Sequence, residues 1–258
     1  MVEASESSGL DRGTLRERET LPRPISRTIR PWGIVAVAGS AYGVLLVLGL
    51  IGAFLTHAVD DATVQKAAEI VLFEEESNLP TLFNFLLLVA NMAAFAVVSA
   101  FAFGGWDKWR WHWLALTALF LLLAYDEAAQ LHEKLSVLLE SRVGGGTGFL
   151  GFAWVVPGMA AVAVVGMALI PFLRALPRRS AVLFLLAGAI FVSGSIGVEM
   201  VEAEYAGRQG WDTLTFSLLT VVEESLEMIG LITLLYGTTS HLVGPHATAR
   251  FALDRVTP

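Results

Sequence analysis

The chain has 258 residues, of which 55% are hydrophobic and only 16% are charged, and its mean hydropathy is +0.64. Soluble domains carry about 25% charged residues, so this composition predicts an integral membrane protein. The net charge of −7 argues against a nucleic-acid partner, and the absence of cysteine excludes disulfides, thiolate metal sites and cysteine nucleophiles.

Residues 1–31 are polar and hold six arginines among scattered serine, glycine and proline. We expect a disordered basic tail on the cytoplasmic side. The apolar run that follows, at about 32–56, is longer than the roughly 7–15 residues of a signal-peptide core. About 20 apolar residues cross a bilayer, so this run is predicted to form the first membrane-spanning helix.

Five further apolar segments, each bounded by polar or glycine-rich loops, complete a predicted bundle of six spanning helices. Their approximate ranges are 81–103, 111–139, 152–173, 181–205 and 214–235. The three glycines at 144–146 indicate a flexible loop. The predicted fold is therefore an all-α integral membrane domain at 32–240, followed by a cytoplasmic C-terminal tail at 241–258.

The placement of lysine and arginine predicts the orientation. With the N-terminus inside, thirteen of the 17 basic residues fall in cytoplasmic segments. Cytoplasmic loops of membrane proteins carry this excess, so both termini are predicted to be cytoplasmic. The expected location is the plasma membrane of a bacterium, its inner membrane, with the lipid bilayer as partner. The oligomeric state stays open.

The longest outer loop, at about 58–80, contains apolar residues at helical spacing, which predicts a short amphipathic helix on the outer surface. The residues with this spacing are Val64, Ala67, Ala68, Val71 and Leu72. Near the end of the loop, Asn78 is predicted to cap the second spanning helix, and Glu76 could act as a lid residue.

Three of the predicted spans carry carboxylates into their outer halves. On insertion scales each charge in hydrocarbon costs roughly 2.5–3.5 kcal/mol, so such residues are rare and usually functional. At about 1.5 Å per residue, the acids of the third, fifth and sixth spans reach the same layer of the membrane. They are Asp126, Glu127 and Glu133, then Glu199 and Glu202, and finally Glu223, Glu224 and Glu227.

The facing of these acids follows from about 100° of rotation per residue. An unbroken third helix places Asp126, Gln130 and Glu133 on one stripe, with Glu127 to its side and His132 pointing well away. Each acidic stripe is expected to face the bundle interior and to line a shared polar cavity. No span is predicted to be interrupted at this site.

The eight acids have at most one lysine, Lys134, nearby. Either several of them hold protons, or bound cations neutralise them. Oxygen ligands favour a divalent metal ion such as Mg²⁺, Ca²⁺, Mn²⁺ or iron. The predicted metal ligands are Asp126, Glu133, Glu199, Glu202, Glu223, Glu227 and His132, and the predicted catalytic carboxylates are Glu127 and Glu224.

Three short patterns occur together in this chain. They are Glu76-x-Asn78-x-Pro80-Thr81, the pair Asp126-Glu127 followed by His132-Glu133, and Glu223-Glu224-Ser-Leu-Glu227. Their combination resembles a family of uncharacterised multi-pass bacterial membrane proteins, over most of the chain from about Trp32. The resemblance implies a six-helix membrane fold and carries no activity with it.

Three functions remain open. The first is a metal-dependent membrane enzyme, whose bound ion activates water or a substrate oxygen and whose substrate is a lipid or another small amphiphile. The second is a cation- or proton-coupled transporter that uses the same acids. The third is a structural or sensory membrane subunit whose acids bind a partner protein. Unbroken spans, and acids placed towards one side of the membrane, favour the first over the second.

Overall fold

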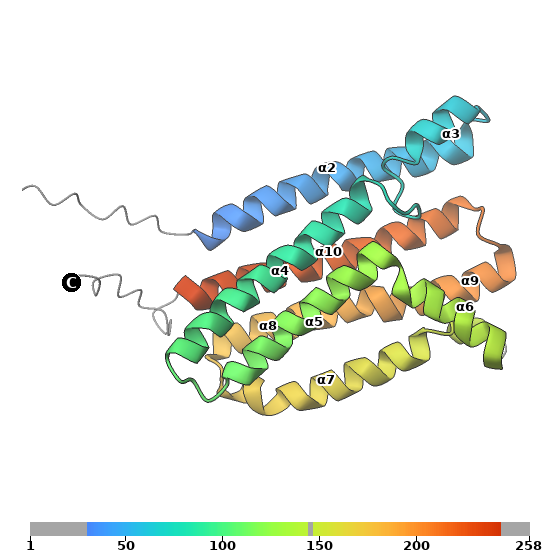
Figure 1. Cartoon of the computed structure of the whole chain (residues 1–258). Coiled ribbons are helices and arrows are strands. Elements are labelled where there is room, and N and C mark those ends of the chain that lie inside the picture. Colours follow the sequence, from blue (N-terminus) through green and yellow to red (C-terminus); the bar gives the residue numbers. More distant parts are fainter. Residues whose placement is uncertain (1–29, 144–146, 244–258) are drawn as a thin grey trace, which may run out of the picture.

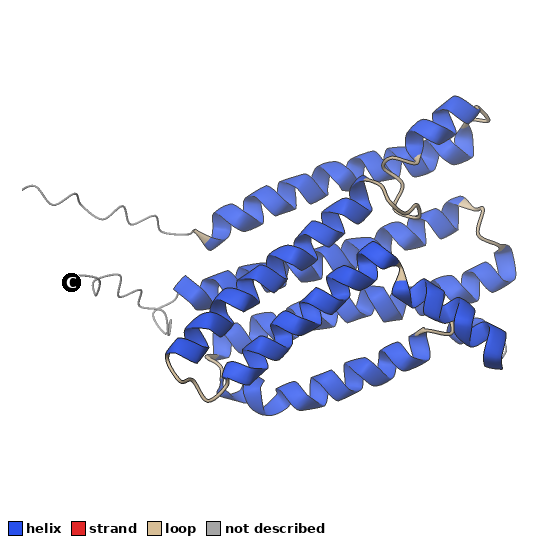
Figure 2. Cartoon of the chain, viewed as in Figure 1, coloured by secondary structure: helices blue, strands red, loops and turns tan. Residues whose placement is uncertain are grey.

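A computed structural model describes residues 30–143 and 147–243, and every regular element within them is helical (Figure 2). In chain order these are α2 (Pro31–Ala58), α3 (Ala62–Ala68), α4 (Leu79–Gly104), α5 (Arg110–Ala129), α6 (Leu131–Val143), the short 3-10 turn η2 (Gly148–Leu150), α7 (Val155–Ala175), α8 (Arg178–Val192), the π-helical segment η3 (Ser193–Val198), α9 (Glu199–Gln209) and α10 (Leu214–Val243).

The predicted tails lie outside the described residues, except that Pro31 begins α2 and residues 241–243 end α10. The glycine run at 144–146 also lies outside them. The remaining chain follows the predicted order of helices, since each of the six apolar segments falls on one or more of the observed helices.

Within the described residues, four helical runs are long and apolar enough to cross a membrane. They are α2, α4, α7 and the continuous run Arg178–Gln209 through α8, η3 and α9. The pair α5 and α6 makes a fifth if it is counted as one bent span, and α10 is not among them. The predicted all-α, membrane-embedded class is thus supported, with four or five candidate spans.

Helix α10 is the central element of the bundle. It packs against α2, α4, α8, η3 and α9, and in Figure 1 it passes behind α4 and α5. Met228 and Leu231, near its middle, are almost completely buried. A polar side chain on the inward face of this helix therefore has protein on several sides.

An aromatic core fills the half of the bundle near the start of α5. The ring of Phe95 on α4 lies 5.3 Å from that of Phe120 and 6.2 Å from that of Trp113, both on α5, and 6.0 Å from that of Phe184 on α8. Such tilted and edge-to-face contacts are favourable for aromatic pairs. The core tightly joins three helices and leaves the opposite half of the bundle for polar residues.

The two ends of the bundle differ in what they carry. Helix α2 begins and α10 ends at one end, whereas α3, α6 and α9 gather at the other (Figure 1). We call the latter the α3–α6–α9 end. The predicted short helix in this loop is present as α3, although it ends before Val71 and Leu72, and Asp61 accepts hydrogen bonds from the backbone N–H groups of Val64 and Thr63 at its start. These donors lower the pKa of Asp61.

The predicted cap of the second span is also confirmed. The side-chain oxygen of Asn78 accepts a hydrogen bond from the backbone N–H of Thr81, at 3.2 Å. Its amide nitrogen donates to the carbonyl oxygens of Glu69 and Leu72, at 3.0 and 2.6 Å. Asn78 thus fixes the loop after α3 against the first turn of α4.

The prediction of uninterrupted spans is wrong for the third span. Gln130 adopts a left-handed conformation, with φ 50° and ψ 48°, and the chain bends by 72° between α5 and α6. The fifth predicted span is continuous, but Ser193–Val198 within it is π-helical. Both irregularities lie directly beside predicted acidic residues.

Candidate functional site

The bend after α5 is held by Asp126 and His132. The backbone N–H of His132 donates to one oxygen of Asp126 at 2.9 Å, and its ring Nδ1 lies 3.0 Å from the other. Because a carboxylate only accepts, Nδ1 carries the proton in this contact and Nε2 stays available. The prediction that His132 points away from Asp126 is wrong, because the left-handed Gln130 turns α6 back towards the end of α5.

Asn84 of α4 links α5 to α10. Its amide nitrogen donates to a carboxylate oxygen of Glu227 at 3.1 Å, and Glu127 is a further neighbour of its side chain. Asn84 is completely buried, and its carbonyl oxygen has no hydrogen-bond partner. Glu127 and Glu227 thus lie beside the same neutral amide, and a shared polar cavity there stays a prediction.

The π-helical segment η3 allows α9 to approach α10 closely. At Gly194 an added Cβ would lie 2.7 Å from the backbone oxygen of Glu223, so no larger residue fits without a shift. Directly after this segment, Glu199 accepts a hydrogen bond from Trp154 Nε1 at 2.5 Å. The ring of Trp154 lies 5.2 Å from the ring of His132, so Glu199 reaches the bend between α5 and α6.

Glu202 lies beside Glu223 and Thr220, which are its neighbours from α10. Glu202 is only 4% exposed, and its Oε1 atom lacks a hydrogen-bond partner. Glu74, on the loop after α3, is an electrostatic neighbour of Glu202 and connects it to the surface.

Helix α10 joins these groups into one network. Glu223 interacts electrostatically with Glu199 and Glu202, while Glu224 interacts with Glu127 and Glu227. All three α10 acids are half-buried, and the Oε2 atom of Glu224 is buried without a partner. We call Asn84, Asp126, Glu127, His132, Glu199, Glu202, Glu223, Glu224 and Glu227 the acidic cluster.

The rim of the acidic cluster lies at the surface. Glu133 is exposed and neighbours Glu76 and His132 rather than the α10 acids. Gln130 is a further neighbour of Glu76 at the bend. Partial burial, and next the charge of Glu133, raise the pKa of Glu76 above its ordinary value of 4.5.

An acidic depression opens near this rim. It occupies about 590 Å³ between the end of α2, α3 and the α9–α10 connection. Its lining includes His57 and five acids, which are Asp60, Glu69, Glu74, Glu75 and Asp212. Since Glu74 also neighbours Glu202, negative charge continues from the surface into the cluster. The sequence prediction missed this depression because its residues come from three separate loops.

Basic side chains near the cluster are engaged elsewhere. Lys134 donates to the backbone oxygen of Ala129, at the C-terminal end of α5, and Arg208 pairs with Glu204 on α9. Over residues 30–143 and 147–243, no lysine or arginine forms an ion pair with a cluster acid. The cluster's positive partners are therefore limited to His132, protons or bound cations.

In the part of the chain that the structure describes, no group of three or more histidine, aspartate or glutamate side chains is arranged to hold a metal ion. The three unpartnered atoms of the cluster, Asn84 Oδ1, Glu202 Oε1 and Glu224 Oε2, are all oxygens. Carbonyl and carboxylate oxygens suit hard cations or proton donors.

One known protein family matches this chain. A model of a domain of unknown function, DUF8692, matches residues 34–242. The chain belongs to this family. The matched residues include the whole acidic cluster, and the predicted membership of an uncharacterised family is confirmed. A comparison with the curated proteins finds no match, and neither does one with the solved structures.

Proposed function

We propose that this chain is a cation- or proton-coupled membrane transporter whose acidic cluster binds and releases the coupling ion. Six spans, with α10 as the sixth, would place both termini in the cytoplasm and the cluster in the outer half of the plasma membrane. The observation that carries the proposal is the acidic cluster itself, in which buried unpartnered oxygens from α4, α9 and α10 lie near the bend after α5 and the π-helical segment η3.

The charge of the cluster supports ion binding. Ionised carboxylates in a low-dielectric environment strongly repel one another unless protons or cations compensate them. The neutral donors present, Asn84 and Trp154, hold Glu227 and Glu199 in place without cancelling their charge. Protonation or cation binding therefore changes the balance of forces among α4, α5, α9 and α10.

The interrupted helices support movement at the site. The bend at Gln130 and the π-helical segment at Ser193–Val198 flank the cluster on two sides. Transporters often place interrupted helices at their ion sites, where freed backbone groups line a cavity. Of the two sequence arguments against transport, the one from uninterrupted spans is removed by the bend at Gln130, whereas the placement of the acids towards one side of the membrane is unchanged.

Buried polar atoms continue from the cluster towards the opposite end. Asn91 Oδ1 on α4, Thr238 Oγ1 on α10 and His112 Nδ1 on α5 are buried without partners. Buried polar groups of this kind are commonly satisfied by ordered water. Waters at these three positions would extend a hydrated path from Asn84 through the bundle.

The direct test is flux in liposomes containing the purified chain, with gradients of protons, Na⁺ and Mg²⁺ imposed in turn. Wild-type chain is expected to dissipate at least one gradient, and Glu223→Gln and Glu227→Gln to abolish that flux. Glu140→Gln is the matched control, because this exposed glutamate of α6 lies outside the cluster. Flux no faster than in empty liposomes for all three ions would overturn the proposal.

Orientation has its own test, because the chain has no cysteine. Ser141→Cys on α6 and Lys108→Cys before α5 place single thiols at opposite ends of the bundle. In intact cells a membrane-impermeant maleimide is expected to label only Ser141→Cys. Labelling of Lys108→Cys in intact cells would reverse the orientation.

A metal-dependent membrane enzyme acting on a lipid-like substrate is the second candidate. It is favoured by the Asp126–His132 contact, since histidines that bind metals usually donate their other ring N–H to a carboxylate. No three such side chains are arranged to hold a metal ion among the described residues, so this candidate requires His132 Nε2, Glu199 and Glu227 to converge on a divalent ion, with Glu127 or Glu224 as general base. Stoichiometric Mg, Ca, Mn or Fe in the purified chain, lost in His132→Ala, would favour this candidate over transport.

A further inference from the structure

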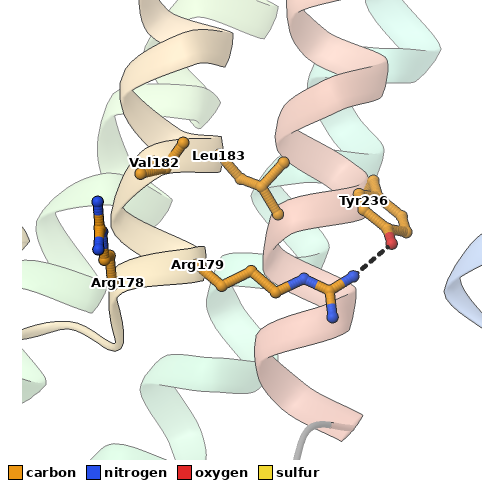
Figure 3. A pocket seen from close by; sticks show the side chains of 5 residues that line it. All are labelled: Arg178, Arg179, Val182, Leu183 and Tyr236. Atoms are coloured by element: carbon orange, nitrogen blue, oxygen red, sulfur yellow. Dashed lines mark hydrogen bonds between the residues drawn. The ribbon is translucent and has the colours of Figure 1, made fainter.

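A second pocket lies at the end of the bundle opposite the acidic cluster. It occupies about 540 Å³ between α8 and α10 and is lined by Arg178, Arg179, Val182, Leu183 and Tyr236 (Figure 3). Four of these residues come from the first two turns of α8, and Tyr236 comes from α10. The pocket therefore combines a cationic edge with largely apolar walls.

The geometry of Tyr236 fixes one side of the pocket. Arg179 reaches from α8 to α10 and donates a hydrogen bond from Nη2 to the hydroxyl oxygen of Tyr236 at 2.9 Å (Figure 3). The ring centroid of Trp32, on α2, lies 5.1 Å from that of Tyr236. An amphipathic tryptophan and tyrosine of this kind are typical of the membrane–water interface. The pocket thus lies at the level where lipid headgroups would be.

Close packing beneath the pocket keeps its floor shallow. At Gly237 an added Cβ would lie 3.2 Å from Leu183 Cβ and 3.2 Å from the ring of Phe184. Val182 is 52% exposed, so its side chain stays open to the surroundings of the bundle. This arrangement leaves an apolar strip along α8 that begins at the two guanidinium groups.

The positive charge in the pocket is uncompensated. Arg178 and Arg179 occupy the first turn of α8, where the helix dipole is already positive. Throughout the described residues, neither guanidinium forms an ion pair with a carboxylate. The excess of arginine in cytoplasmic segments of membrane proteins accounts for arginines at this end. It does not account for two arginines that line one pocket together with a tyrosine hydroxyl and an apolar floor.

We propose that this pocket binds the phosphate headgroup of an anionic phospholipid, with an acyl chain along Val182 and Leu183. A phosphate oxygen accepts hydrogen bonds from the Arg179 guanidinium, whose planar donors suit phosphate geometry, and Arg178 adds positive charge. Basic pockets between spanning helices on the cytoplasmic side recognise lipid headgroups in this way. The site is separate from the acidic cluster and does not depend on what that cluster does.

The test compares lipids that differ only in headgroup charge. The full-length chain, in a neutral detergent, is titrated with short-chain phosphatidylglycerol, with phosphatidylcholine of the same acyl chains, or with inorganic phosphate. The rise in thermal midpoint gives the apparent Kd of each. Phosphatidylglycerol is expected to bind more tightly than either alternative. Arg178→Gln and Arg179→Gln are each expected to weaken its binding about fivefold.

Two further variants keep the result interpretable. Arg110→Gln is the matched control, because Arg110 lies at the same end but stacks on Phe103 and Trp106 outside the pocket. Tyr236→Phe removes the hydrogen bond and retains both charges, so the preference for phosphatidylglycerol should persist even if Arg179→Gln destabilises the fold. Three results would overturn the proposal: equal affinity for the two lipids, an equal rise in thermal midpoint with inorganic phosphate, or an equal loss of phosphatidylglycerol affinity in Arg110→Gln.

Discussion

Asn84 Nδ2 donates a hydrogen bond to Glu227 Oε2 across 3.1 Å and 143 positions of sequence. Glu127 of α5 also neighbours this amide, so one neutral side chain lies beside two acids from different helices. Its carbonyl oxygen is buried without a partner. On the proposed function, Asn84 orders Glu227 for a positive ligand that this oxygen can help to bind.

Replacing Asn84 should weaken cation binding more than it weakens the fold. Hydrogen bonds to charged groups are worth about 1.5–3 kcal/mol, so Asn84→Leu should bind the cation about 10- to 100-fold more weakly. The measurement is the shift in thermal midpoint with the concentration of the cation identified by flux. Asn91→Leu is the control, since Asn91 donates only to the carbonyl oxygens of Leu87 and Leu231. Equal cation dependence in both variants would contradict the role of Asn84.

The bend at Gln130 should tolerate glycine and reject a β-branched residue. Non-glycine residues at positive φ are strained by about 1–3 kcal/mol, and valine is among the least tolerant. Gln130→Val should therefore lower the free energy of unfolding by about that amount and separate His132 from Asp126. Gln130→Gly should keep the bend. The fluorescence of Trp154, which packs on His132, reports the difference. Similar stability in the two variants would mean that α5 and α6 do not require the left-handed residue.

Much of this architecture was predictable from composition and periodicity. Apolar segments predicted the helices, because about 20 residues of hydrocarbon-compatible sequence leave few alternatives. Asn78 was predictable as a cap because its position before Pro80 matches a local rule. The prediction also placed acids of three spans at one level. It assigned them to a common site without knowing which pairs make contact.

The contacts within the cluster were not predictable, because they depend on interruptions. A rotation of about 100° per residue holds only along an unbroken helix, so the left-handed Gln130 reverses the expected facing of His132. No glycine or proline announces this break, since Gln130 stands between Ala129 and Leu131. The amide of Asn84 likewise finds Glu127 and Glu227 only through the packing of α4 against α5 and α10.

Glu76 should make stability depend on pH in a definite direction. Its pKa is raised in the folded chain by partial burial and by Glu133, so folding favours the protonated form. The stabilising contribution is present below its ordinary value of 4.5 and is lost as pH rises through the higher folded value. Glu76→Gln should flatten this fall in thermal midpoint, whereas Glu140→Gln should leave it unchanged. A steeper fall of the thermal midpoint with pH in Glu76→Gln would contradict a raised pKa of Glu76 in the folded chain.

The contact between η3 and α10 can be tested with two glycines of the same segment. A Cβ on Gly194 would lie 2.7 Å from Glu223 O and 3.0 Å from Leu226 Cβ, whereas one on Gly197 would meet nothing within 4 Å. Gly194→Ala should therefore destabilise the chain by about 1–3 kcal/mol, as overpacking does. Gly197→Ala should be neutral or stabilising by up to about 1 kcal/mol, because alanine favours helix.

The same pair connects packing to function. Forcing η3 away from α10 also moves Glu199 from Glu223, so Gly194→Ala should alter cation-dependent flux while Gly197→Ala retains it. Denaturant unfolding in detergent measures the first difference, and liposome flux measures the second. If Gly194→Ala unfolds like wild type yet loses flux, the close approach serves the acidic cluster rather than stability. If both variants keep wild-type stability and flux, α10 does not need contact with η3 at this point.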